Sequence, residues 1–424
     1  MKIGILYDDG GSVGLDLRRP DLGNPGVGGS QFCFLMLVLY YKKHYPNDQI
    51  LLYHTNEAGN IYWDDIECKH ISNLNSFATE CKKDGIDILL INFSRLKTLD
   101  KSIEDNQIKT IVWVHNFITG EFLKIAKKNR YVRRIVFVGK EQYDRYIDDD
   151  LIDKSECIFN MFNSECKEYT RNAVLTPIVT YTGAIVKGKG FHALAMHWKE
   201  VLKSVPNAEL YVIGSGKLYD RKAKMGSYGI ATEAYEHEFM PYLTDDNGNI
   251  LKSVHFCGIL GSEKVDIYKK TKVGVINPTA RTEICPLSAI EMEACGIPVV
   301  SKFKNGMPDV IENGVTGMLS YSANDFKKNL IKLLMDDSLN EQYSVNAKKY
   351  IAEKFAPERI IVQWNNTFNA VMNDEKPVFE KPTKNWNNNY KWIRVINRGA
   401  RKIFRFVPSV AAIECAVVNL LRRR

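Results

Sequence analysis

At 424 residues the chain exceeds what one hydrophobic core usually serves, and 45% hydrophobic with 25% charged residues is the composition of a globular protein. This composition excludes a disordered or fibrous chain and predicts two domains of ordinary size. The net charge of +8 is concentrated at one end: residues 375–424 hold twelve Lys/Arg and three Asp/Glu, a net of +9, which leaves −1 for residues 1–374. Such a basic tail favours an anionic surface, either nucleic acid or acidic lipid.

The chain starts with a strand-like apolar segment, Met1 to Tyr7, and shows none of the charged and apolar regions of a signal peptide. Its nine cysteines include no C-x-x-C pair with metal-site or redox spacing. We therefore expect a cytoplasmic protein with reduced cysteines.

Short apolar runs rich in Ile, Val and Leu recur along the chain and alternate with stretches of helical period. The first series is Lys2–Leu6, Gln49–Tyr53, Ile86–Ile91, Thr110–Val114 and Arg134–Val138, and the second is Ile178–Tyr181, Glu209–Ile213, Gly274–Ile276 and Ile297–Val300. This is the pattern of buried parallel strands in βαβ units. The sequence thus predicts two Rossmann-like, doubly wound α/β domains.

Domain boundaries follow from the polar stretches between these series. The segment Asn163–Pro177 separates them, so we place an N-terminal domain at residues 1–165 and a C-terminal domain at 166–355, which ends in a helix from about residue 339. Pro357 can open another helix at its first turn. We expect this helix, in residues 356–373, to pack back on the N-terminal domain, and residues 374–424 to form a basic amphipathic tail.

Three glycines precede a helical pattern in the segment Pro25–Ser30. Gly28 and Gly29 can let the backbone approach a phosphate, whose charge a helix N-terminus favours. A flexible loop with Ser30 as N-cap explains the same residues.

Two further segments place polar residues just after predicted strands. His115 follows the run Thr110–Val114, at the edge where open α/β sheets bind ligands, although a structural histidine is the commoner reading. The loop from Gly183 to Gly190 could hold a diphosphate through Lys189 and backbone amides, or be an ordinary turn with solvated lysines.

The segment Asn277–Val300 reads as strand, loop, short helix and strand. Its carboxylates Glu283 and Glu291 can accept hydroxyl hydrogen bonds from a vicinal diol, and the amides near Leu287 and Ser288 open a helix that favours an anion. The alternative is a capping box, in which Ser288 and Glu291 close their own helix.

Glu283 and Glu291, separated by seven residues and followed by Ala294–Val300, resemble the E-x7-E signature of the family 4 retaining glycosyltransferases. Other segments agree with that family in order and spacing: Gly28-Gly29, His115, Asn160, Gly183–Gly190, Val212–Gly216 and Val254–Gly258. The resemblance spans roughly residues 1–373. It implies the GT-B fold, with an acceptor-side N-terminal domain and a nucleotide-sugar-binding C-terminal domain facing a central cleft.

The resemblance also implies roles for individual residues. Glu291 would hold the ribose hydroxyls and Glu283 the donor sugar near its reacting carbon. The amides of Leu287 and Ser288 would face the diphosphate, and Lys189 would neutralise the charge on it as it leaves. His115 would lie beside the donor sugar, and the glycines Gly28, Gly29 and Gly183 would approach the phosphates.

One departure from the family lies at Ala184, where the family usually has Arg. Either Lys187 or another basic side chain compensates, or the donor binds differently. Pro286 likewise supplies no N–H to the sugar. The resemblance otherwise implies chemistry without a metal or a cofactor, with the nucleotide sugar as donor substrate.

The tail segments Lys391–Arg398 and Arg401–Val407 mix cations with bulky apolar and aromatic groups. Such segments lie at anionic membrane surfaces. The apolar stretch Phe406–Leu421 contains Pro408 and Glu414 and is too short to span a bilayer. We favour an interfacial anchor through residues 391–424 over a helix packed on the body and over nucleic-acid binding.

Together these interpretations predict a metal-independent retaining hexosyltransferase, peripheral at the inner face of the membrane. It would move a sugar, from a UDP-sugar in preference, to a glycan or lipid-linked acceptor of lipopolysaccharide or capsule type. The alternatives are a nucleotide-sugar epimerase of the same fold and a non-catalytic sugar-nucleotide-binding subunit, with which Ala184 is compatible.

Overall fold

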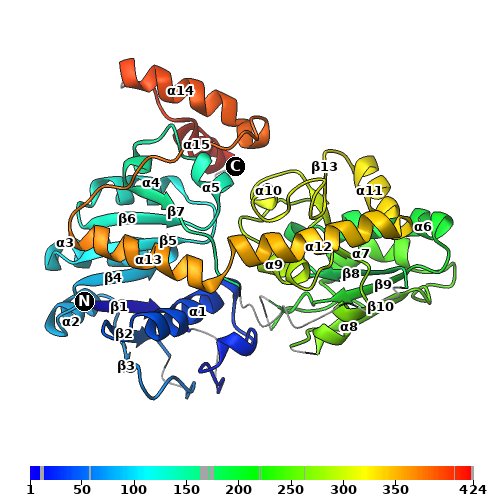
Figure 1. Cartoon of the computed structure of the whole chain (residues 1–424), viewed down its shortest axis with the longest axis horizontal. Helices are drawn as coiled ribbons and strands as arrows, with labels where there is room; N and C mark the ends of the chain where they lie inside the picture. Colours follow the sequence, from blue (N-terminus) through cyan, green and yellow to red (C-terminus); the bar gives the residue numbers. More distant parts are fainter. Residues whose placement is uncertain are drawn as a thin grey trace. The chain divides into compact units, whose positions relative to one another are not determined.

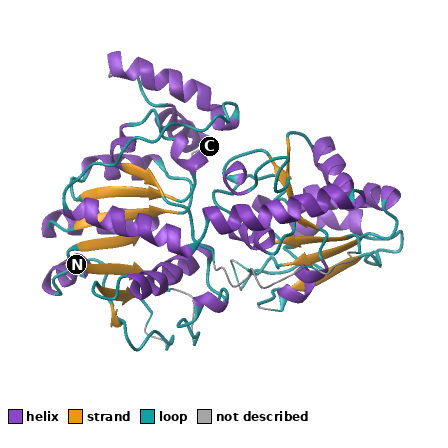
Figure 2. Ribbon diagram, in the orientation of Figure 1, coloured by secondary structure: helices purple, strands orange, loops and turns teal. Residues whose placement is uncertain are grey.

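The computed structural model describes residues 1–9, 14–56, 59–162, 171, 176–218, 220, 222–261, 263–404 and 406–421. It divides into two compact units, unit 1 with residues 1–161 and 357–424, and unit 2 with residues 162–356. The boundary predicted at residues 165 and 166 lies outside the described residues. In each unit, helices cover both faces of one sheet (Figures 1 and 2), as in a doubly wound α/β domain.

Unit 1 is built on a seven-stranded parallel sheet with the order β3-β2-β1-β4-β5-β6-β7. Its strands are β1 (Lys2–Tyr7), β2 (Gln49–His54), β3 (Glu67–His70), β4 (Ile88–Asn92), β5 (Lys109–Val114), β6 (Val132–Phe137) and β7 (Ser155–Cys157). The strand order reverses between β1 and β4, which is where ligands of open α/β sheets bind.

The helices of unit 1 come from both ends of the chain. They are α1 (Gly29–His44), α2 (Phe77–Lys83), α3 (Leu96–Asn106), α4 (Gly120–Lys128), α5 (Lys140–Asp144), α13 (Pro357–Met372), α14 (Lys391–Ile403) and α15 (Val410–Leu421), with 3-10 turns at Pro20–Leu22, Phe93–Arg95, Asp150–Lys154 and Asn388–Tyr390. Helix α13 packs on α1 and β5: the ring centroids of Tyr41 and Phe368 are 5.2 Å apart, and those of Trp113 and Trp364 are 4.7 Å apart. These aromatic contacts bury the apolar face of α13.

Unit 2 is built on a six-stranded parallel sheet with the order β10-β9-β8-β11-β12-β13. Its strands are β8 (Ile178–Thr182), β9 (Glu209–Ile213), β10 (Val254–Gly258), β11 (Val273–Val275), β12 (Val299–Lys302) and β13 (Met318–Ser320). Its helices are α6 (Phe191–Ser204), α7 (Glu233–Leu243), α8 (Lys264–Lys270), α9 (Leu287–Ala294), α10 (Met307–Val310), α11 (Ala323–Met335) and α12 (Asp337–Lys354), with a 3-10 turn at Lys187–Lys189. The prediction of two doubly wound α/β domains is confirmed.

The tail lies against unit 1 rather than apart from it. Lys109 Nζ lies 3.0 Å from Asp374 Oδ1, the backbone N–H of Cys157 donates to Glu380 at 2.9 Å, and Ala411 of α15 belongs to the hydrophobic core. The sequence favoured a membrane anchor over a helix packed on the protein. That preference was wrong in excluding packing, because α14 and α15 do pack on unit 1. No helix within the described ranges is both long and apolar enough to cross a membrane.

Candidate functional site

Unit 2 brings Lys189 and Glu283 together beyond the carboxyl ends of β8 and β11. Lys189 ends the 3-10 turn that follows β8, and Glu283 lies in the loop that follows β11. Lys189 Nζ is 2.6 Å from Glu283 Oε1, and Asn277 Nδ2 donates to the same oxygen at 2.8 Å. Glu283 is only 6% exposed. The ammonium and the amide therefore compensate a largely buried carboxylate.

Glu291 is held by a second lysine. Lys264 Nζ of α8 lies 2.5 Å from Glu291 Oε1, and the Tyr268 hydroxyl donates to Glu291 Oε2 at 3.4 Å. Burial, followed by the Glu291 charge, raises the pKa of Tyr268 well above its usual value, so this phenol stays protonated. The Tyr268 hydroxyl also lies 3.1 Å from Thr182 Oγ1 at the end of β8.

Helix α9 begins at Leu287, as predicted, with Pro286 as its N-cap. The amides of Leu287 and Ser288 are the first two of the helix and have no acceptor within it, so they can donate to an anion. The capping-box alternative was wrong: Ser288 lies inside the helix, the cap makes no side-chain hydrogen bond, and Glu291 pairs with Lys264 instead.

The loop after β8 approaches its neighbours closely. Gly183 has a φ of +158° and donates its N–H to Ile213 at 3.0 Å. A Cβ on Gly214 would lie 1.9 Å from the Gly183 carbonyl oxygen, so only glycine fits there. Ala184 is buried, and Lys187 donates to Glu238 of α7 at 2.6 Å. The ammonium of Lys187 is thus paired with Glu238. Besides Lys189, Lys264 also contacts a carboxylate of the E-x7-E motif.

In unit 1, His115 directly follows β5 and packs against Trp113, with ring centroids 4.5 Å apart. Its two ring nitrogens are buried, and among the described residues neither has a hydrogen bond of normal geometry, although the Asn160 side chain lies near enough to favour the charged form. Burial lowers the pKa of His115 to about 3. The imidazole is therefore neutral at physiological pH, with one donor and one acceptor nitrogen.

Gly28 is the N-cap of α1 and Gly29 is its first residue, and both are exposed. The Gly28 N–H donates to Gln31 Oε1 at 2.8 Å. The alternative with Ser30 as N-cap was wrong, because the helix begins before Ser30. The exposed glycines leave the start of α1 open to a ligand.

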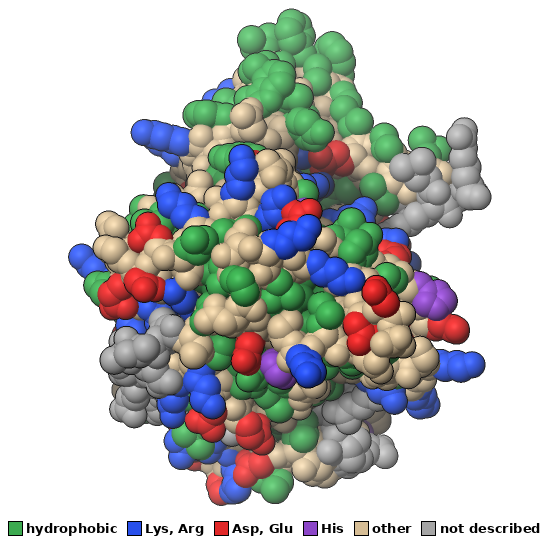
Figure 3. Space-filling model, turned by 90° about the vertical axis from the view of Figure 1, so that its right-hand side faces the viewer, with side chains coloured by type: hydrophobic (Ala, Val, Ile, Leu, Met, Phe, Trp, Pro, Cys, Tyr) green, Lys and Arg blue, Asp and Glu red, His purple; other side chains and the backbone are tan. Residues whose placement is uncertain are grey.

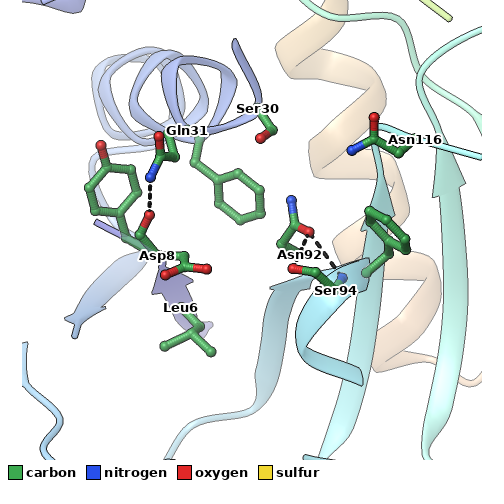
Figure 4. Close-up of a pocket in the computed structure, with 10 residues that line it drawn as sticks. Leu6, Asp8, Ser30, Gln31, Asn92, Ser94 and Asn116 are labelled. Atoms are coloured by element: carbon green, nitrogen blue, oxygen red, sulfur yellow. Dashed lines mark hydrogen bonds between the residues drawn. The ribbon is translucent and has the colours of Figure 1, made fainter. Parts of the chain in front are cut away.

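Beside this helix start lies a cavity of about 220 Å³. It is lined by Leu6, Tyr7, Asp8, Ser30, Gln31, Phe34, Asn92, Phe93, Ser94 and Asn116. Figure 4 shows Ser30 and Gln31 reaching it from α1, and Asp8, Asn92 and Asn116 from the ends of β1, β4 and β5. Arg95 pairs with Asp8 at 2.6 Å. This concentration of amide, hydroxyl and carboxylate groups suits a hydroxylated ligand.

Sequence reasoning missed several residues of these arrangements. Asn92 ends a buried parallel strand, and Asp8 and Asn116 lie just after two others, so that position alone could have identified them. Asn277 lies within the segment singled out from the sequence, but nothing in the sequence marked it as a partner of Glu283. No motif marks Lys264 or Tyr268, whose roles depend on where α8 packs.

Residues 167–350 match the family described as glycosyl transferases group 1. The chain is 28% identical over 202 residues to the capsular polysaccharide biosynthesis glycosyltransferase CapM of Staphylococcus aureus, an alignment that covers 47% of each chain. It is 30% identical over 92 residues to N-acetyl-alpha-D-glucosaminyl L-malate synthase of Bacillus anthracis, covering 21% of this chain and 24% of that one. The chain thus spans about half or less of the length of these curated relatives.

Two solved structures extend the likeness to both units. HepE of Anabaena superposes with a TM-score of 0.65 at 15% identity, covering 87% of this chain and all of that chain. Sucrose-phosphate synthase of Thermosynechococcus elongatus superposes with a TM-score of 0.63 at 16% identity, covering 88% and 99%. At such identity the likeness concerns the fold alone, and it confirms the GT-B fold. Residues 167–350, which are less than half of the chain, thus resemble the glycosyl transferases group 1 family.

Proposed function

We propose that the protein is a retaining glycosyltransferase that moves a sugar from a nucleotide-diphosphate sugar, UDP-sugar in preference, to a glycan or lipid-linked acceptor in surface polysaccharide biosynthesis. The observation that carries this proposal is the pair of lysine-bound carboxylates in unit 2, Lys189 with Glu283 and Lys264 with Glu291, next to the open start of α9. The name of CapM supports the polysaccharide acceptor, and the structures of HepE in complex with UDP support the donor class.

Different residues of unit 2 bind the ribose, the diphosphate and the sugar of the donor. Glu291 binds the ribose hydroxyls, and the amides of Leu287 and Ser288 donate to the diphosphate at the positive end of α9. Lys189 then exchanges its contact with Glu283 for a phosphate oxygen and stabilises the charge that develops on the leaving diphosphate. Glu283 remains to accept a hydrogen bond from the donor sugar near its anomeric carbon.

The transfer itself breaks the bond between the anomeric carbon and the phosphate oxygen, and the diphosphate leaves with the electron pair. The acceptor oxygen forms its bond on the face that the diphosphate leaves, so the configuration is retained. The acceptor's hydroxyl proton passes to the departing phosphate oxygen. No step requires a metal or a cofactor, since Lys189 and the α9 amides supply the positive charge.

The cavity in unit 1 is proposed as the acceptor site. Its side chains Asn92, Ser94 and Asn116 offer both donors and acceptors, as sugar hydroxyls require. The ring of His115 is neutral, so it would offer one donor to a sugar ligand without adding charge. The exposed apolar side chains and lysines of the tail support a position at the inner face of the membrane, where a lipid-linked acceptor would lie.

Release of UDP from a UDP-sugar tests the proposal, measured with and without a lipid-linked or polysaccharide acceptor. Acceptor-dependent release, with an NMR-determined product anomer that matches the donor anomer, is the expected result. Acceptor-independent interconversion of UDP-sugars would identify the epimerase instead. Binding of UDP-sugar without any turnover would favour the non-catalytic subunit, in agreement with the buried Ala184.

A further inference from the structure

Helix α14 has the reverse of the usual amphipathic arrangement. Its residues Arg394, Asn397, Arg398 and Arg401 recur at helical spacing on one side, and this charged side faces unit 1. A helix on the surface of a soluble protein normally buries its apolar side and exposes its charges. The opposite side of α14 is therefore the unusual one.

The charged side is fastened by buried ion pairs. Lys391 Nζ lies 2.8 Å from both Glu141 Oε1 and Asp144 Oδ2, and all three side chains are buried. The Arg394 guanidinium lies 2.6 Å from Glu414 Oε1 and donates to the carbonyl of Arg145 at 2.6 Å. Because breaking a buried ion pair is strongly destabilising, these contacts fix the orientation of the helix.

Further contacts extend this fastening along the helix. Arg398 donates to the carbonyl of Ile147 at 2.6 Å, Asn397 Nδ2 donates to Asp148 at 2.8 Å, and Arg401 lies 3.0 Å from Asp150. These basic residues, which the sequence assigned to lipid binding, serve to attach the helix to the protein. The affinity of the tail for a membrane must come from its other residues.

The outward side carries large apolar and aromatic groups. The exposed fractions are 48% for Trp392, 64% for Ile396, 75% for Ile403, 52% for Phe404 and 85% for Phe406. Hydrophobic side chains are gathered at the top of the view in Figure 3, the end at which Figure 1 places α14. A contiguous exposed patch of this kind marks a surface that another apolar body covers.

We propose that this outward side of α14, with Phe404 and Phe406 beyond its end, lies in the interface of an anionic lipid bilayer. The inference deepens the membrane position given under the proposed function by naming the face that makes the contact. Helix α14 would lie in the plane of the membrane, with its ion-paired side on the protein and its apolar side among the acyl chains.

The charge and the aromatic residues of the tail indicate that an anionic bilayer covers the patch. The tail has exposed lysines at Lys376, Lys381 and Lys384, which precede α14, and at Lys402, which lies on it. The acidic residues of 376–421 are Glu380 and Glu414, and both are engaged with unit 1. The exposed lysines of the tail, among them Lys402 directly before Ile403 of the patch, complement acidic headgroups. Trp386, Tyr390 and Trp392 are exposed aromatic groups of the kind enriched at membrane interfaces.

Sedimentation of the full-length protein with vesicles tests the inference. Vesicles of phosphatidylglycerol and phosphatidylcholine should sediment the protein, whereas pure phosphatidylcholine vesicles should bind it at least about fivefold less, because each surface lysine loses its anionic partner. The double variant Ile396→Asn with Phe404→Asn should lower the partition coefficient about tenfold or more. Val345→Asn is the matched control, since Val345 is an aliphatic side chain of α12 with 59% exposure.

The fluorescence of Trp392 provides a second measurement of membrane contact. The tryptophan emission should shift to the blue when anionic vesicles are added, and the shift should be smaller in Trp392→Phe. Failure of the wild-type protein to sediment would overturn the inference, as would equal sedimentation of the double variant and Val345→Asn. A dimer that the double variant converts to a monomer would reassign the patch to self-association.

Titration with UDP separates this inference from the proposed donor site. The double variant should bind UDP as the wild type does, because the patch and the lysine-bound carboxylates lie in different units. If neither the wild type nor the double variant binds UDP, the proposed donor site is wrong. The vesicle result still decides the inference about α14.

Discussion

The ammonium of Lys189 lies 2.6 Å from Glu283, a residue 94 positions later in the chain. Each of the two is expected to contact a different part of the donor, the diphosphate and the sugar. In the structure they neutralise each other at the end of the sheet. Under the proposed function, donor binding would replace this contact with one between Lys189 and a phosphate oxygen.

Glu283→Gln should reduce UDP release from the donor by at least about 100-fold, because the sugar loses an ionised acceptor next to the reacting carbon. The affinity for UDP should stay the same or rise, since Lys189 no longer has to leave a carboxylate. Steady-state kinetics and calorimetry measure the two effects. Glu238→Gln, which removes the exposed partner of Lys187, should leave both unchanged. Near-normal turnover in Glu283→Gln would remove this residue from the site.

Lys189→Met should weaken UDP binding about 10- to 100-fold, the usual worth of a charge-assisted hydrogen bond. Lys187→Met is the matched control, because Lys187 belongs to the same 3-10 turn and pairs with Glu238. Its affinity should remain within about twofold of the wild type. Equal losses in both variants would indicate a diffuse basic field instead of one phosphate contact.

Glu291→Gln should weaken the binding of UDP about tenfold, since the proposed function has the carboxylate accept hydrogen bonds from the ribose hydroxyls, which an amide oxygen accepts less strongly. The same change should affect 2′,3′-dideoxy UDP less than about twofold, because that ligand lacks both hydroxyls. Calorimetric titration of the two ligands provides the comparison. An equal loss for both would show that Glu291 only positions Lys264 and Tyr268.

The lowered pKa of His115 gives a pH dependence with a definite sign. The unfolded chain takes up a proton near the ordinary pKa of 6.5, whereas folded His115 does so only at about 3. Between these values the free energy of unfolding should fall by about 1.4 kcal/mol for each unit that the pH is lowered. His115→Gln should lose this component in urea unfolding at pH 5 and pH 7. An unchanged difference between the two pH values would contradict the burial of a neutral ring.

Glu293 should give a pH dependence of stability with the opposite sign. Burial raises its pKa well above the usual value, and the Thr316 hydroxyl donates to Glu293 Oε1 at 3.0 Å. Folding therefore retains a proton that the unfolded chain releases above about pH 4.5, so stability falls as the pH rises toward the folded pKa. Glu293→Gln, which needs no proton, should raise the melting temperature at pH 7.5 and flatten its decline with pH. A lower melting temperature at every pH would contradict a protonated Glu293.

The strands that the sequence predicted are the interior strands of the two sheets. The strands that it missed, β3, β7, β10 and β13, lie at the sheet edges. Interior strands are covered on both faces and read as continuous apolar runs. The edge strands lack such runs, because β3 and β10 are partly exposed, while β7 and β13 have only three residues each. Periodicity alone could not distinguish them from loops.

The residues of the candidate site were also only partly predictable from the sequence. Glu283, Glu291 and the start of α9 were predictable, because their spacing fixes them within one loop and one helix. Their partners were not, since Lys189 meets Glu283 and Lys264 meets Glu291 only through the order of the strands. The orientation of α14 was also beyond the sequence: its charges suggested an outward basic face, but buried Glu141 and Asp144 draw Lys391 inward.

The most direct test of the account is a thermal-shift measurement of the purified protein against UDP, GDP, dTDP, CDP and ADP and their sugar conjugates, in the presence of EDTA. A ligand that binds the native state raises the midpoint by mass action. The account predicts a clear rise with one nucleotide class, UDP in preference, which Lys189→Met reduces and Lys187→Met preserves. No rise with any of these ligands, or a rise that Lys189→Met leaves intact, would contradict it.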